Sequence, residues 1–161
     1  MGDGISGLIG AAIGGVLAFA GAFWTGRNQG RTQHEQWLRQ VRRDAYAQFI
    51  IQAEKAHQLG HEADEAVRDE DADATERIEE LARAAYRVRE AATLVALEGP
   101  KQIALDASNI QIGVDRWVNA LRMICEGRAD DAAWERATRL PDHVEDGLSS
   151  FTVTCQALLD R

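Results

Sequence analysis

The sequence is poor in the residues that build disulfide frameworks, metal clusters and tight turns. Its 161 residues include only two cysteines, Cys125 and Cys155, and two prolines. Two cysteines without paired metal-ligand spacing provide neither a disulfide framework nor a zinc site, and they suit a reducing compartment. The scarcity of proline, together with abundant alanine, glutamate and arginine, favours helices over sheet. We therefore predict an all-α protein.

Local signatures of catalytic chemistry are also missing. The sequence contains no glycine-rich phosphate loop and no Ser/His/Asp or Cys/His nucleophile arrangement with a known local pattern. We therefore expect no enzymatic activity and no cofactor.

Positive charge is in the minority and is unevenly distributed. The chain has 18 Lys and Arg residues against 26 Asp and Glu residues, which gives a formal net charge of −8. Residues 1–45 contain five basic and three acidic side chains, so the rest of the chain carries the acidic excess. An acidic body repels phosphate backbones, which argues against nucleic acid as a partner.

The longest uncharged stretch lies near the N-terminus. Residues 5–24, ISGLIGAAIGGVLAFAGAFW, carry no charge. A helix of about 20 residues, at about 1.5 Å per residue, matches a hydrocarbon core of about 30 Å. Trp24 ends the stretch, where an interfacial aromatic residue belongs. We therefore predict a transmembrane anchor over residues 1–26, with the lipid bilayer as the first partner.

A cleavable signal peptide is the alternative for this segment. Ala18-Phe19-Ala20 is similar to a cleavage site, but the residues before the apolar run include Asp3 and no Lys or Arg. Basic residues follow the run instead, at Arg27 and Arg31. By the positive-inside rule the protein is then a single-pass protein of the cell membrane with its C-terminal domain in the cytoplasm. Arg27 and Arg31 are close enough to the predicted membrane surface to contact anionic lipid headgroups.

Small residues recur within the apolar run at helical spacing. Two rows repeat them every four residues: one is Gly10, Gly14, Ala18, Ala22 and Gly26, and the other is Gly7, Ala11 and Gly15. Small residues at this spacing let two helix backbones approach closely and pack by van der Waals contact. We favour self-association into a homo-oligomer through this helix. Chance spacing in a Gly/Ala-rich anchor is the alternative.

Four amphipathic segments follow the anchor. The first extends from about residue 32 to 68, and later segments are separated by the acidic stretch 69–73, by Gly99-Pro100 and by Gly127. Each repeats apolar residues at three- and four-residue steps, as a coiled-coil-like bundle requires. The third is the most regular, with Ile103, Ala107, Ile110, Val114, Trp117, Leu121 and Ile124. We predict an antiparallel four-helix bundle over residues 39–161, whose long first helix begins with a basic juxtamembrane stalk at 27–38.

Polar residues mark the expected helix ends. Asp73 with Glu76 has the spacing of a capping box at the start of the second bundle helix. Gly127 is expected to end the third helix, and Asp130 or Asp131 to cap the fourth.

Two segments carry a resemblance to a known set of proteins. Residues 42–49 read RRDAYAQF in the first bundle helix, and residues 97–100 read LEGP at a turn. With the Gly/Ala-rich span and the basic juxtamembrane segment, they resemble uncharacterised small single-pass helical membrane proteins of high-GC Gram-positive bacteria. The resemblance implies the same architecture, and it supplies neither an activity nor functional residues.

One cluster in the first bundle helix has metal-binding chemistry. Glu54, His57, His61 and Glu65 follow one another at steps of three and four residues, which places them on one helix face. Two imidazoles one turn apart can chelate a transition metal, and a carboxylate can complete the shell. A di-iron site would need a second Glu-x-x-His on another helix, and the sequence has none. A solvated charged face is the alternative that we favour.

The function that these patterns favour is a membrane-tethered helical interaction or scaffold module. It self-associates, docks a cytoplasmic partner protein, or does both. The alternative is a subunit of an oligomeric membrane pore, because a glycine-patterned helix can pack into a ring. A single span without a charged residue offers no ready pore lining, which weighs against this alternative.

Overall fold

Four α-helices and no strand make up residues 3–159, the part of the chain that the computed structural model describes. The helices are α1 (Asp3–Arg68), α2 (Ala74–Glu98), α3 (Lys101–Cys125) and α4 (Asp131–Leu159). Side-chain surroundings are described for residues 36–159. The prediction of an all-α helical bundle is confirmed for the described residues. The segments that the sequence divides into anchor, stalk and first bundle helix form the single helix α1.

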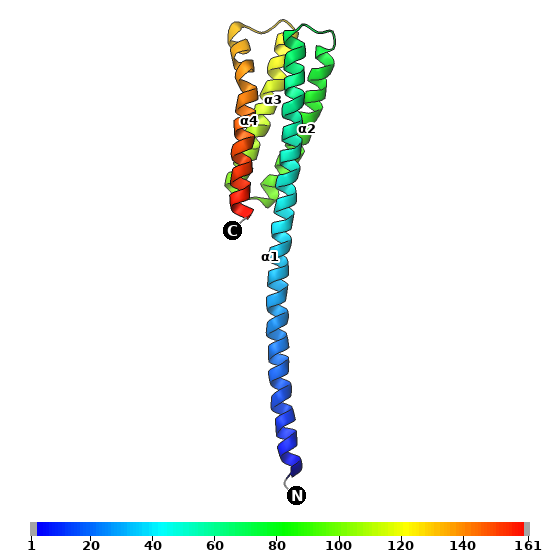
Figure 1. Cartoon of the computed structure of the whole chain (residues 1–161), viewed down its shortest axis with the longest axis vertical. Coiled ribbons are helices and arrows are strands. Elements are labelled where there is room, and N and C mark those ends of the chain that lie inside the picture. Colours follow the sequence, from blue (N-terminus) through cyan, green and yellow to red (C-terminus); the bar gives the residue numbers. More distant parts are fainter. Residues whose placement is uncertain (1–2, 160–161) are drawn as a thin grey trace. The chain divides into compact units, whose positions relative to one another are not determined.

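The chain divides into two compact units, Met1–Gln40 and Val41–Arg161. α1 contributes to both, and the second unit contains the bundle. In this unit α2, α3 and α4 pack beside the C-terminal part of α1 (Figure 1). The boundary between these units is close to residues 38 and 39, where the sequence predicts that the stalk ends and the bundle begins.

Contacts between neighbouring helices show that the bundle is antiparallel. Arg89 of α2 donates a hydrogen bond of 2.9 Å to Asp115 of α3, and Arg122 of α3 donates one of 2.7 Å to Glu79 of α2. Later residues of one helix thus meet earlier residues of the next. Between the first and last helices, the ring of Phe49 lies 4.8 Å from that of Phe151.

The core consists of the apolar stripes that the periodicity predicts. The largest fully buried side chains are Trp117, Phe49, Phe151, Leu81 and Ile103. Six of the seven α3 stripe residues are buried, and the last, Ile124, is half-buried. The bundle therefore has a continuous core to which all four helices contribute.

The helix ends agree with the sequence in two places and differ in one. The Oδ1 atom of Asp130 accepts a hydrogen bond of 2.7 Å from the Ala133 backbone N–H, so Asp130 caps α4. Gly127 has a φ of +66° and follows α3, as expected. The capping box at Asp73 is wrong: this side chain makes no cap hydrogen bond. Its Oδ2 atom instead pairs with Arg77 at 3.4 Å, which takes the carboxylate away from the helix end.

No helix among residues 36–159 is long and apolar enough to cross a membrane. The predicted anchor lies outside these residues. So do its packing residues Gly7, Gly10, Ala11, Gly14, Gly15, Ala18 and Ala22, and the predicted membrane-contact residues Arg27 and Arg31.

Candidate functional site

Two histidines of α1 lie against each other on the bundle surface. The Nε2 atoms of His57 and His61 are 3.2 Å apart, and the centroids of the two rings are 4.6 Å apart. A contact of this length between two ring nitrogens is a hydrogen bond in which one imidazole donates to the other. His57 is half-buried and His61 is exposed, so solvent reaches the pair.

The buried ring of Trp117 lies directly beneath the two histidines. Its centroid is 6.0 Å from that of His57 and 5.5 Å from that of His61. Trp117 is fully buried, so one side of each imidazole rests on a fixed surface. The Trp117 Nε1–H has no hydrogen-bond partner within the described residues.

Gly60 makes this arrangement possible. It is buried in α1 between the two histidines in sequence, and a Cβ atom there would lie 2.3 Å from Cζ3 of Trp117. Real Cβ atoms are essentially never that close to another heavy atom. The indole ring of α3 therefore crosses the bundle centre and reaches the α1 backbone because residue 60 has no side chain.

The two carboxylates of the predicted cluster lie in different surroundings. Glu54 lines a groove between α1 and α4 with His57, Glu145 and Ser149, and the groove has a volume of about 390 Å³. Glu65 lines an acidic groove with Glu62, Asp69, Asp71 and Asp73 at the turn between α1 and α2. Within residues 36–159, no group of three or more His, Cys, Asp or Glu side chains is arranged to hold a metal ion. The structure thus brings together the two histidines of the predicted set.

Asp64 adds negative charge beside the histidines. It is buried to 7% exposure and pairs with Arg68 at 2.7 Å. Burial raises the pKa of its carboxyl group, and the nearby Arg68 and His61 oppose this shift.

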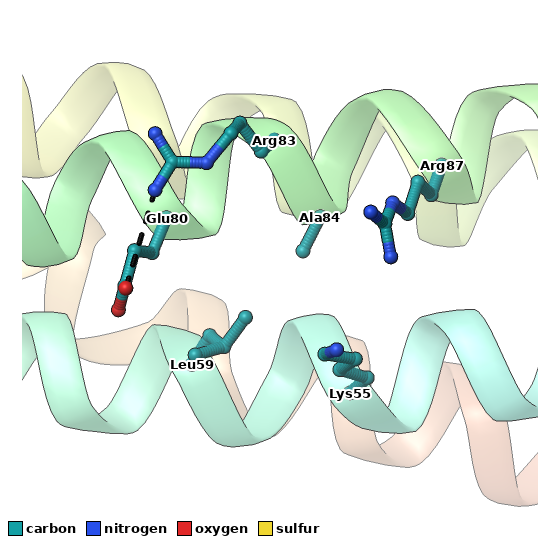
Figure 2. Close-up of a pocket in the computed structure, with 6 residues that line it drawn as sticks. All are labelled: Lys55, Leu59, Glu80, Arg83, Ala84 and Arg87. Carbon is teal, nitrogen blue, oxygen red and sulfur yellow. Dashed lines mark ion pairs between the residues drawn. The ribbon is translucent and has the colours of Figure 1, made fainter.

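A second site, which the sequence analysis missed, is a basic groove between α1 and α2. Three cations, one carboxylate and two apolar side chains line it, and they are Lys55, Arg83, Arg87, Glu80, Leu59 and Ala84. Its volume is about 220 Å³. Figure 2 shows Arg87 reaching from α2 toward α1, on which Lys55 lies, whereas Arg83 turns toward Glu80.

Carboxylates neutralise the cations of this groove only weakly, although the protein carries a net charge of −8. Arg83 is 4.0 Å from Glu80, the outer limit of an ion pair, and neither Lys55 nor Arg87 has an ion-pair partner within residues 36–159. Elsewhere on the bundle, Arg68, Arg77, Arg89 and Arg122 hold carboxylates at 2.7 to 3.4 Å. The groove is therefore suited to an anionic group. In the sequence, only Arg83 and Arg87, one turn apart in α2, indicate this groove. Lys55 could not be added to them, because periodicity does not say which α1 residue lies opposite.

Comparison with protein-family models, with curated proteins and with solved structures found no match to this chain.

Proposed function

We propose that the protein is a membrane-tethered helical interaction module that self-associates through its N-terminal helix and docks a cytoplasmic protein through its bundle. One observation carries this proposal. The uncharged run of residues 5–24 belongs to the first compact unit, whereas the second unit has a core of its own. The run has the length and composition of a membrane span, and the bundle buries its apolar stripes without help from a membrane.

The basic groove supports the docking part of the proposal. Lys55 and Arg87 face a shared groove without a carboxylate partner among residues 36–159, so an acidic segment of a partner would compensate both charges. Charge complementarity of this kind increases association rates and selects partners.

Membrane attachment and orientation are tested by extraction and by a reporter. The full-length protein should stay in the membrane fraction after carbonate washing. A C-terminal reporter that works only outside the cytoplasm should be silent. Release by carbonate would refute the anchor, and an active reporter would refute the orientation.

Self-association is tested by crosslinking in native membranes. Gly14→Leu keeps the run apolar but places a bulky side chain in the small-residue row, so the yield of crosslinked oligomer should fall. Leu17→Ile is the matched control and should leave the yield unchanged. Equal yields from wild type and Gly14→Leu would remove the anchor from assembly.

The docking surface is tested in the same crosslinked membranes. The double charge reversal Lys55→Glu with Arg87→Glu should abolish heterologous crosslinks to the bundle. Lys101→Glu with Arg116→Glu, two exposed cations of α3, is the matched control and should keep them. Loss in both variants would show that net charge, and not the groove, selects the partner.

A further inference from the structure

We propose that His57 and His61 form a chelating site for one divalent transition-metal ion of the zinc, nickel and copper type. Imidazole nitrogen is a preferred ligand of these ions, and two histidines one helical turn apart present their nitrogens to the same point in space. This inference concerns a binding property of the bundle and does not depend on the proposed membrane tether or docking partner.

The distance between the two nitrogens fits a shared ion. The Nε2 atoms are 3.2 Å apart. An ion at about 2.05 Å from each nitrogen would subtend an angle of about 103° between them, which is close to tetrahedral. Both rings would then carry their proton on Nδ1, so that each Nε2 lone pair faces the ion, and neither side chain would need to move to another helix face.

The surroundings hold the pair in place before an ion arrives. α1 is a continuous helix at these residues, so the backbone spacing of the two histidines is fixed. Trp117 is fully buried and packs against both rings, with centroids at 6.0 and 5.5 Å. A site in which the ligands are already oriented loses less conformational entropy on binding.

Negative charge around the pair favours a cation. Glu54 and Glu145 line the same groove as His57, and the Asp64 carboxyl interacts electrostatically with His61. The protein also carries a net charge of −8. With two protein ligands and His61 exposed, water occupies the remaining coordination positions, so the site is an open, exchangeable one.

The first test is metal binding to the full-length chain, purified in mild detergent and stripped with a chelator. Titration with Zn²⁺, followed by calorimetry, should show one saturable site per chain. His61→Gln removes an exposed side chain, so the fold should be kept while Zn²⁺ affinity falls at least about tenfold. His143→Gln, at an exposed histidine of α4, is the matched control and should bind as wild type does. Circular dichroism of each variant verifies the helix content.

The second test locates the ion. Cu²⁺ quenches tryptophan emission at short range, so it should quench Trp117, whose ring contacts both histidines. Trp117→Phe should lose most of this quenching while retaining Zn²⁺ binding, and His57→Gln with His61→Gln should lose both.

Zn²⁺ binding to the folded chain should also raise its melting temperature in wild type and His143→Gln, and not in the double variant. The proposal is overturned if wild type binds no Zn²⁺, or if His143→Gln weakens binding as much as His61→Gln does. It is also overturned if the double variant binds as wild type does.

Discussion

Gly60 is the position at which α1 accommodates the indole ring of Trp117. We expect Gly60→Ala to destabilise the protein although alanine is the better helix former by about 1 kcal/mol. The new Cβ would lie 2.3 Å from a fully buried ring that cannot move aside, and overpacking of this kind costs about 1–3 kcal/mol or more. Denaturation of the full-length chain in urea measures the effect. Gly147→Ala, whose Cβ would approach the Ile110 side chain at 3.0 Å, is the milder control.

Trp117 fills the centre of the bundle. Trp117→Ala should leave a cavity and cost about 3–5 kcal/mol, a large share of a domain's usual stability. Trp134 is 38% exposed near the start of α4, so Trp134→Ala should cost less. Melting temperatures of the two variants give the comparison. A larger loss for Trp134→Ala would contradict the central role of Trp117.

The two cysteines should differ sharply in reactivity. Cys125 is exposed, whereas Cys155 is buried, and burial raises the pKa of the Cys155 thiol from 9.0 to about 11. Because the thiolate is the reactive form, Cys155 should stay protonated and inert at neutral pH. Mass spectrometry after timed alkylation should find Cys125 modified first, and modification of Cys155 should accelerate only as the pH approaches 11. Equal rates at neutral pH would mean that α4 opens readily.

Sequence periodicity identifies the inward face of each helix, and no more than that. It correctly predicts that Trp117 is buried, because the residue lies within a regular stripe. It does not reveal Gly60 as a packing position, because the level at which a side chain of α3 meets α1 depends on how the two helices align along their axes. The same limit applies to Glu65, which shares a helix face with His61 by spacing and yet lines a groove that neither histidine lines.

At the scale of the element, the end of α3 is fixed by a backbone motif. The Arg128 N–H donates to the Met123 carbonyl at 2.9 Å, and the Gly127 N–H donates to the Ile124 carbonyl at 2.9 Å. These two bonds form a Schellman motif, in which the residue after the cap adopts a left-handed conformation. Gly127 does so, with a φ of +66°.

Substitution of Gly127 therefore tests the conformation separately from packing. Gly127→Ala should destabilise the chain by about 1 kcal/mol, because a left-handed conformation is costly for residues with a Cβ atom. A Cβ atom here would meet no atom within 4 Å, so no clash contributes. Gly127→Asn should cost less than Gly127→Ala, since asparagine tolerates this region better. Chemical denaturation of both variants checks the order.

The helix boundaries show where sequence signals succeed. Gly99 follows α2 directly, and Gly127 is the second residue after α3. At each end, a backbone N–H of the glycine donates a hydrogen bond to a carbonyl group of the last helical turn. The capping box at Asp73 failed because a nearby Arg77 competes for the same carboxylate. Such competition depends on side-chain geometry, which residue spacing alone does not contain.

At the scale of the whole molecule, α4 closes the bundle. The Phe151 ring packs against Tyr46 at 6.2 Å and against Phe49 at 4.8 Å. A chain that ends after residue 147 would lack Phe151 and leave both α1 rings exposed. We expect it to aggregate or to be degraded, whereas a chain that ends after Leu159 should melt as the full chain does. Size-exclusion chromatography and thermal melting distinguish the two truncations.

The position of Phe151 also sets the order in which the protein can form during its synthesis. Its partners on α1 leave the ribosome about 100 residues earlier, and local helix–helix contacts form quickly once both partners are present. α2 and α3 can thus pair while translation continues, but the Tyr46 and Phe49 rings of α1 stay uncovered until α4 is made. The newly made chain therefore passes through a stage in which three helices expose the surface that the fourth will cover. Docking of α4 is therefore the step that completes the bundle, and chaperones or premature contact between nascent chains would act before it.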